Sequence, residues 1–286
     1  MRQKLGQHFL RNKKTLDSIA RTANFQEGDV VIEIGSGHGE LTVKLLHYPI
    51  SIIAIEKDPT FVEYLSEKFQ NTNSKFQINS IRQPANQLPK LEIIEGDVRK
   101  ILPEFVKERG FESGAYKLIG NIPYYLTAYL FRIIGSLYKK PSVCIFTLQK
   151  EVALRITANP PNMNLLASSI QYWGVPEIVG FIPKKSFSPP PKVDSAIIKI
   201  TTLPVIPDKN KIKETQYYTL TKTLFAHPRR TIFNNLRDLA ETENIKKETL
   251  MERLSDVGIN PANRPQDLNV KAIKKICGIV YNEVDE

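Results

Sequence analysis

The sequence predicts an α/β fold: a doubly wound, mostly parallel sheet over residues 1–204, followed by a small all-helical domain over residues 205–286. Three observations indicate this fold class. Short β-branched runs alternate with helix-like stretches through the first two hundred residues, which is typical of a parallel sheet covered by helices. A glycine-rich turn follows the first run directly. Beyond the proline-containing stretch 203–207 only helical patterns remain, so we place the domain boundary there.

The parallel part of the sheet is expected to contain five buried strands, at Val30–Ile34, Ser51–Ile55, Leu91–Glu95, Tyr116–Gly120 and Ser142–Leu148. Helical patterns separate or follow them, through Leu41, Leu45 and Leu46, at Pro59–Gln70, at Val98–Leu102, at Thr127–Leu137 and at Glu151–Ala158. Pro59 stands at the first position of its helix, where its missing N–H costs nothing. Two later strands, Pro176–Ile182 and Ser195–Thr201, have no helix between them. We therefore expect them to close the sheet as an antiparallel pair.

The segment Asn71–Pro89 is rich in Asn, Gln and Ser and shows neither a helical nor a strand period. Such a segment between two strands is expected to be a surface insertion. We expect it to be dispensable for the chemistry.

The net charge of +10 is concentrated at the two ends of the chain. Residues 1–24 carry six Lys and Arg against one acid, residues 25–179 carry sixteen against sixteen, and residues 180–286 carry eighteen against thirteen. A balanced centre with basic flanks is typical of an enzyme that acts on a polyanion, because Lys and Arg contact phosphates. Charge that only keeps the protein soluble is the alternative interpretation.

Other classes of protein find little support in the composition. No apolar run approaches the roughly 18 residues that a membrane span requires, and the N-terminus has no secretory pattern. Only Cys144 and Cys277 are present, and the four His residues have no ligand spacing, so neither a disulfide framework nor a metal site is expected. We expect a cytoplasmic protein without a metal.

A cofactor site is predicted where the first strand runs into Gly35, Gly37 and Gly39, with Glu33 just before them. Glycine permits unusual backbone angles and close approach of a ligand. Twenty-one residues after Gly35 the next strand ends at Glu56, which can accept both hydroxyls of a ribose. The third strand ends before Asp97, whose carboxylate can accept from an adenine amino group or cap the following helix.

The spacing of the glycines favours one cofactor over another. Nicotinamide-binding folds prefer G-x-G-x-x-G and hold a pyrophosphate at the helix N-terminus. Here the order is acid-x-G-x-G-x-G, and an acid next to the turn suits a sulfonium cation better than a pyrophosphate. The pattern therefore favours S-adenosylmethionine.

The fourth strand leads into Asn121-Ile122-Pro123-Tyr124. An exocyclic adenine amine is a poor nucleophile, so an enzyme that methylates it must hold it with hydrogen-bond acceptors. The Asn121 side-chain oxygen and the Ile122 carbonyl can each accept one N–H, Pro123 stiffens the turn, and Tyr124 offers a ring on which an extruded base stacks. Phe187 is a candidate for the other face of the base. An ordinary turn and a packed loop aromatic are the structural alternatives.

Taken together, these motifs resemble the ribosomal RNA adenine dimethyltransferases, with their Rossmann-like S-adenosylmethionine-dependent sheet, over nearly the whole chain. The resemblance implies that His8 and Leu10, in Gly6-Gln7-His8-Phe9-Leu10, contact the cofactor, as do Gly35, Glu56, Asp97 and Asn121. Further matching segments are Leu148–Val152, Phe187–Ala196, Arg229–Thr231 and Arg264–Leu268. Two features depart from the family pattern: Asn162–Leu165 replaces a usual Tyr-Gly pair, and the 71–89 segment is longer than expected.

The resemblance is strongest to the small-subunit branch, and it implies dimethylation of two adjacent adenines in the 3′-terminal hairpin of 16S ribosomal RNA within the 30S particle. A monomer is expected for an enzyme that docks on such a particle. Three alternatives stay open: the macrolide-resistance branch that acts on 23S RNA, a non-catalytic RNA-binding or assembly factor, and a nicotinamide dehydrogenase.

Overall fold

The structure of the chain is a computed structural model that describes residues 8–70, 76–78, 90–111, 114–204 and 213–281. Its strands are β1 (Phe9–Leu10), β2 (Val30–Ile34), β3 (Ser51–Glu56), β4 (Phe76–Ile78), β5 (Leu91–Glu95), β6 (Tyr116–Asn121), β7 (Val143–Gln149), β8 (Gly174–Ile182), β9 (Phe187–Ser188) and β10 (Ser195–Thr202). Its α-helices are α1 (Lys13–Thr22), α2 (Glu40–Leu45), α3 (Pro59–Gln70), α4 (Val98–Glu108), α5 (Thr127–Ser136), α6 (Lys150–Ile156), α7 (Leu165–Gln171), α8 (Glu214–Leu224), α9 (Ile232–Thr242), α10 (Lys247–Asp256) and α11 (Val270–Tyr281).

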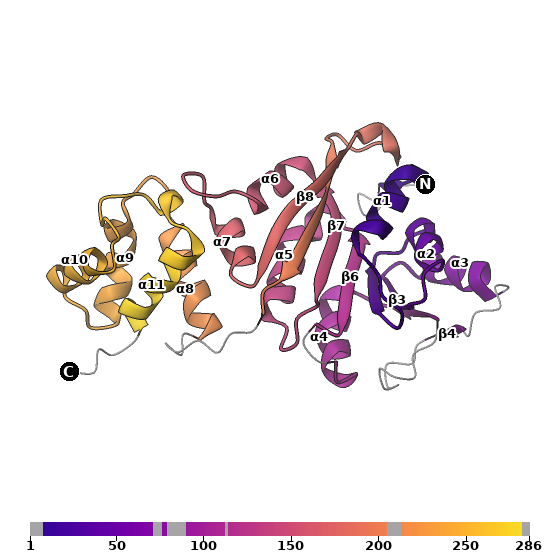
Figure 1. The fold of residues 1–286 in the computed structure, drawn as a ribbon, viewed down its shortest axis with the longest axis horizontal. Helices are drawn as coiled ribbons and strands as arrows, with labels where there is room; N and C mark the ends of the chain where they lie inside the picture. The colour runs from indigo at the N-terminus through magenta and orange to yellow at the C-terminus, as the bar shows by residue number, and fades with distance from the viewer. Residues whose placement is uncertain (1–7, 71–75, 79–89, 112–113, 205–212, 282–286) are drawn as a thin grey trace. The chain divides into compact units, whose positions relative to one another are not determined.

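Within the described residues, one sheet has the strand order β4-β5-β3-β2-β6-β7-β10-β8 (Figure 1). The strands from β4 to β7 pair in parallel, and β10 pairs antiparallel with both β7 and β8. The prediction of a doubly wound α/β sheet closed by an antiparallel pair is confirmed. Since β2 lies at the reversal of strand order, the carboxyl ends of β2, β3 and β6 form the edge where ligands of such sheets bind.

Helices cover both faces of this sheet because successive strand residues point to opposite sides. On one face, apolar residues of α1, α2 and α3 are buried with strand residues such as Val31, Ile52 and Ile93. On the other face, Phe131 of α5 packs edge-on against Phe146 of β7, with 5.8 Å between ring centroids. The predicted buried runs are therefore apolar on both sides, as central parallel strands require.

A two-stranded ladder between β1 and β9 was not predicted. Phe9 pairs with Ser188, and Leu10 pairs with Phe187. The backbone N–H of Arg11 also donates to the Ser186 carbonyl over 3.0 Å. The ladder fixes the N-terminal segment against the loop between β8 and β10.

The 71–89 segment contains an element that its lack of a period did not predict. Residues 76–78 form β4, which pairs in parallel with β5 at one edge of the sheet. The expectation of a surface insertion concerns the rest of the segment, residues 71–75 and 79–89, which lie outside the described residues.

The chain divides into two compact units, residues 1–154 with 174–202, and residues 155–173 with 203–286. The predicted boundary after residue 204 lies close to the second transition, but residues 155–173 differ from expectation by belonging to the helical unit. Met163 and Ala167 are buried with α8, α9, α10 and α11, and the Tyr217 hydroxyl donates to the Ser168 carbonyl over 3.1 Å. Packing against the later helices therefore places α7 in the second unit. Over the described residues, no helix combines the length and apolarity of a membrane span.

Candidate active site

A cavity in the first unit opens at the carboxyl ends of β2, β3, β5 and β6. The strand ends and the turns that follow them supply most of its lining, and the N-terminal segment and β9 supply the rest: His8, Phe9, Ile34, Gly35, Gly37, Ile55, Glu56, Lys57, Gly96, Asp97, Val98, Arg99, Asn121, Ile122, Pro123, Tyr124, Tyr125, Leu126 and Phe187. Of the residues that the sequence analysis placed at the site, Leu10, Gly39 and Glu33 are absent from this set. The structure therefore gathers residues up to 179 positions apart into one site.

The glycine turn after β2 has the backbone geometry that its sequence predicted. Gly35 and Gly37 have φ values of +72° and +53°, which side-chain-bearing residues rarely adopt. A Cβ atom on Gly37 would lie 2.9 Å from the ring of Phe9. The N-terminal segment thus crosses the turn in a space that only glycine leaves open.

Glu56 is held in place at the tip of β3. Its Oε1 atom accepts hydrogen bonds from the backbone N–H groups of Lys57 and Asp58, over 2.8 and 2.9 Å. Its Oε2 atom accepts from the N–H of Gly37 over 2.9 Å. The side chain is 5% exposed, and its carboxylate faces the cavity as a fixed acceptor, which suits the hydroxyl groups of a ribose.

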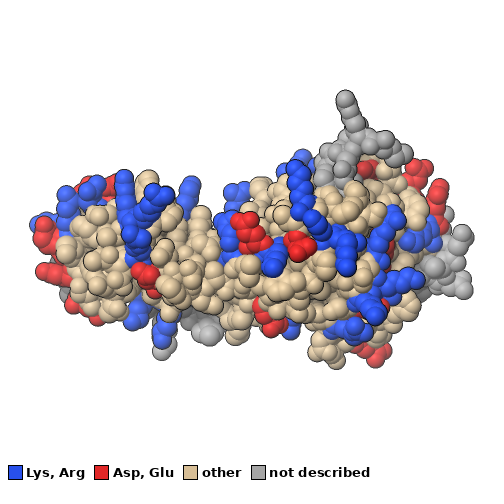
Figure 2. All heavy atoms as spheres, turned by 90° about the horizontal axis from the view of Figure 1, so that it is seen from above, with Lys and Arg blue, Asp and Glu red and all other residues tan. Residues whose placement is uncertain are grey.

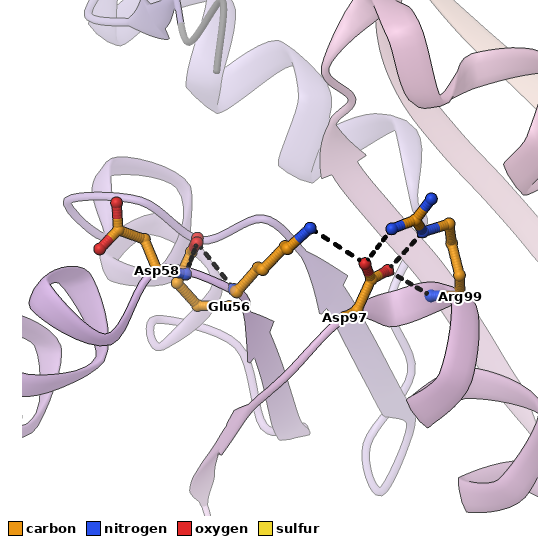
Figure 3. A network of polar contacts seen from close by, with 5 residues as sticks. Glu56, Asp58, Asp97 and Arg99 are labelled. Carbon is orange, nitrogen blue, oxygen red and sulfur yellow. Dashed lines mark hydrogen bonds and ion pairs between the residues drawn. The ribbon is translucent and has the colours of Figure 1, made fainter. Parts of the chain in front are cut away.

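Asp97 serves as the N-cap of α4 and also binds two cations (Figure 3). Its Oδ1 atom accepts from the backbone N–H and the Nε of Arg99, over 3.0 and 2.8 Å. Its Oδ2 atom accepts from an Nη of Arg99 and lies 3.1 Å from the Nζ of Lys57. The Arg99 hydrogen bond holds the pKa of this carboxyl well below its usual range, so Asp97 is an acceptor at neutral pH.

Asn121 ends β6 with its side chain anchored. Its Nδ2 atom donates to the backbone carbonyl of His8 over 2.8 Å, and no described residue donates to its Oδ1. The backbone N–H of Ile122 donates to the Thr147 carbonyl over 3.1 Å. These contacts fix the start of the Asn121–Tyr124 turn and leave the amide oxygen as an acceptor.

Tyr124 is half-buried beside the cavity. Its hydroxyl hydrogen-bonds to the Ser195 hydroxyl over 3.0 Å, and its ring centroid lies 5.9 Å from that of His8. Burial raises the pKa of Tyr124, so the phenol stays neutral. The ring is available as a flat wall of the site rather than as a proton acceptor.

Phe187 and Leu10 occupy the β1–β9 ladder. Phe187 lines the cavity but is only 4% exposed and is packed in the sheet's core cluster. Leu10 is buried in the same cluster and is absent from the cavity lining. Stacking of a base on Phe187 stays a prediction, as does a cofactor contact of Leu10.

Glu33 does not face the cavity, although the sequence suggested that it could lie near a sulfonium. It is 1% exposed, and its Oε2 atom accepts from the Thr42 hydroxyl of α2 over 2.6 Å. As a residue inside β2 it points to the helix-covered face of the sheet. Burial raises its pKa to about 7.

The cavity residues that were not singled out from the sequence include three with polar side chains, Lys57, Arg99 and Tyr125. Lys57 and Arg99 follow Glu56 and Asp97 by one and two residues, and this proximity was the available signal. Among the described residues, no group of three or more His, Cys, Asp or Glu side chains is arranged to hold a metal ion.

Basic side chains are spread over the visible face of each unit (Figure 2). In the first unit a second, shallow hollow is lined by Lys150, Lys184 and Lys192 together with Glu151, Leu154, Val193 and Asp194. Asp194 joins this hollow to the active site, because its Oδ1 atom accepts from the Lys184 N–H over 2.9 Å and the next residue bonds Tyr124.

Comparison with known proteins identifies relatives over almost the whole chain. The family model described as ribosomal RNA adenine dimethylase matches residues 1–276. A protein of Dehalococcoides mccartyi named ribosomal RNA small subunit methyltransferase A is 34% identical over 276 residues, which are 96% of this chain and 87% of the relative. A protein of the same name from Mycoplasma mycoides is 32% identical, with 96% of each chain covered.

Solved structures show the same fold. A dimethyladenosine transferase from Plasmodium falciparum has a TM-score of 0.72 at 22% identity, covering 94% of this chain and 96% of that one. The 23S rRNA methyltransferase ErmE has a TM-score of 0.68 at 19% identity, covering 96% and 100%. The Rossmann-like methyltransferase sheet is thereby confirmed. The matches to the family model and to the two relatives establish that this chain belongs to the ribosomal RNA adenine dimethylase family of methyltransferases.

Proposed function

We propose that the enzyme transfers methyl groups from S-adenosylmethionine to the exocyclic amino groups of two adjacent adenines in the 3′-terminal hairpin of 16S ribosomal RNA, giving dimethyladenosine. One observation carries this proposal. The amide nitrogen of Asn121 is bonded to the His8 carbonyl over 2.8 Å, so its oxygen is presented as an acceptor beside the cavity. An acceptor fixed in this way suits an amine donor.

The cavity residues fit S-adenosylmethionine. Glu56, already fixed by three backbone N–H groups, would accept from the ribose hydroxyls, and Asp97 would accept from the adenine amino group. Gly35 and Gly37 leave room for close approach to the backbone, and His8 would contact the cofactor from above the turn. When bound, the cofactor supplies a methyl group that is activated by its sulfonium.

The target adenine would be held by the Asn121–Tyr124 turn. The Asn121 Oδ1 atom and the Ile122 carbonyl would each accept one N–H of the exocyclic amine, and Pro123 keeps the turn rigid. The ring of Tyr124, oriented by Ser195 over 3.0 Å, would stack on the extruded base, with Phe187 on its other side. Because the methyl donor is already activated, positioning accounts for the rate and no strong general base is required.

The substrate particle would be held by the basic surfaces. The segment 180–286 carries eighteen Lys and Arg against thirteen acids, and the hollow with Lys150, Lys184 and Lys192 adjoins the active site. Lys and Arg in such numbers suit a phosphate backbone. We infer that the partner is the 30S particle, that the enzyme acts in the cytoplasm, and that it works as a monomer.

Incubation with radiolabelled S-adenosylmethionine and undermethylated 30S particles tests the proposal. Dimethyladenosine should appear at adjacent positions of 16S RNA, and Asn121→Ala should reduce its rate on the order of 100-fold, since misplaced reactants cost about that much. In a parallel incubation with 23S RNA, label in that RNA would instead favour the macrolide-resistance activity. Binding of 30S particles without calorimetric binding of the cofactor would indicate a non-catalytic factor.

A further inference from the structure

The mouth of the cavity continues onto an exposed surface that the proposed reaction does not use. We call it the tyrosine face and define it by Tyr125, Tyr129 and Arg132. Tyr125 lies in the 3-10 turn Tyr124–Leu126, and Tyr129 follows it by four residues in α5. The two tyrosines are 59% and 42% exposed, and Tyr125 also lines the cavity. Large exposed aromatic side chains at and beside a cavity are typical of a binding surface.

Two arginines flank this face. The guanidinium carbon of Arg132 lies 4.6 Å from the ring centroid of Tyr129, and that of Arg99, from α4, lies 5.8 Å from the same centroid. Both arginines are exposed. Rings that stack on bases, beside cations that pair with phosphates, are the recurrent means by which proteins hold single-stranded nucleic acid.

Arg99 is also bound to Asp97, and the acceptor capacity of that carboxylate is already full. A carboxylate offers about four lone-pair sites. The backbone N–H, the Nε and an Nη of Arg99, together with the Nζ of Lys57, supply four donors to Asp97 (Figure 3). An adenine amino group can bind Asp97 only if one of these donors leaves. The side chains of Lys57 and Arg99 are 49% and 42% exposed, so either can leave toward solvent. Of the two, Arg99 also lies against the ring of Tyr129, so its release is the one that bears on the tyrosine face.

We propose that the tyrosine face and Arg99 bind the RNA nucleotides next to the target adenine, and that Arg99 becomes available to them when the cofactor's adenine amino group takes its place on Asp97. The proposal rests on the proposed function. When an adenine is extruded, its neighbours lose a stacking partner, and Tyr125 and Tyr129 offer replacement rings. Arg132 and the released Arg99 would pair with their phosphates. Cofactor binding would therefore strengthen RNA binding.

The affinity for undermethylated 30S particles, measured by filter binding with and without S-adenosylhomocysteine, tests the stacking role. Tyr129→Ala should weaken binding about tenfold, because one stacked base contributes on that order. The matched control is Tyr138→Ala. Tyr138 follows α5, is 92% exposed and also pairs with a cation, Lys139, at 5.2 Å. It differs from Tyr129 in its partner, because the cavity residue Arg99 lies against the ring of Tyr129. Tyr138→Ala should leave the affinity unchanged.

A second set of measurements tests whether cofactor binding strengthens RNA binding. The wild-type enzyme should bind 30S particles more tightly with S-adenosylhomocysteine, and Arg99→Gln should abolish this difference. The same variant should bind S-adenosylhomocysteine in calorimetry at least as tightly as the wild type, since a competitor for Asp97 is removed. Arg132→Gln should lower the slope of log affinity against log salt by about one, as expected for one lost phosphate contact.

The outcomes separate this inference from the proposed function. Suppose that the wild type dimethylates 30S RNA but Tyr129→Ala has the same affinity for 30S particles as Tyr138→Ala. The tyrosine face then does not contact RNA, and the inference is wrong while the proposed function stands. If Arg99→Gln loses cofactor affinity, Arg99 supports the cofactor site instead of competing for Asp97, and the coupling is refuted. Failure of the wild type to form dimethyladenosine would overturn the proposed function.

Discussion

Glu33 should make the first unit less stable as the pH rises from 4.5 to about 7. The side chain is 1% exposed, and burial raises its pKa from 4.5 to about 7, with the nearby carboxylates of Glu56 and Glu40 adding to the effect. The folded protein therefore retains the proton at pH values where the unfolded chain has lost it. The contribution of Glu33 to stability is complete below pH 4.5, falls as the pH rises from 4.5 to about 7, and then levels off.

The size of this effect follows from the shift. One pKa unit corresponds to about 1.4 kcal/mol, so ionised Glu33 should cost about 3 kcal/mol of the free energy of unfolding at pH 8. Glu33→Gln removes the ionisation and keeps an oxygen that can accept from the Thr42 hydroxyl. The variant should match the wild type near pH 5 and exceed it by up to about 3 kcal/mol at pH 8.

Urea unfolding followed by far-UV circular dichroism at pH 5, 6, 7 and 8 measures the difference between the two proteins. The control is Glu63→Gln, because Glu63 is exposed on α3 and its replacement should not change the pH profile. A gap between Glu33→Gln and the wild type that is the same at pH 5 and pH 8 would show that Glu33 does not hold its proton in the fold.

Three further changes have defined outcomes. Gly120→Ala would place a Cβ 2.5 Å from a backbone carbonyl of β2 and should cost about 1–3 kcal/mol in urea unfolding, whereas Gly180→Ala, which meets open space, should not. Arg109→Met leaves the fully buried Glu92 without its ion-pair partner and should cost about 3–5 kcal/mol, most of which a second change, Glu92→Leu, should restore. Glu56→Ala removes the carboxylate that we propose accepts from the ribose of the cofactor and should weaken S-adenosylmethionine binding in calorimetry at least about tenfold.

The parts of the fold that the sequence predicted are those with a strong local signal. The strand Val30–Ile34 and the helix Pro59–Gln70 have the predicted bounds, because a continuous β-branched run and a helix with proline at its first position are unambiguous patterns. The β1–β9 ladder was missed, since two-residue strands have no period and their pairing joins residues about 180 positions apart. Only the folded chain brings them together.

The site residues, too, were predicted where the local sequence signal was strong and missed where it was weak. Strand-end residues such as Glu56 and Asn121 were placed correctly at the cavity, because parallel strands deliver their carboxyl ends to one edge. Glu33 was associated with this edge, although as a residue inside its strand it points to α2. The contacts of Lys57 and Arg99 with Asp97 were not foreseen, since the direction of a long flexible side chain is set by its surroundings and not by its own sequence position.

The pairing of β1 with β9 has a consequence for the order of events during synthesis. Phe9, which covers Gly37, is held by Ser188, and His8, which anchors Asn121, bonds through its ring to the carbonyl of Pro189 over 2.8 Å. Residues 188 and 189 must therefore be synthesised before Phe9 and His8 can be held over the glycine turn. Chains that end before residue 187 lack β9, and we expect them to bind S-adenosylmethionine more weakly than the full chain does.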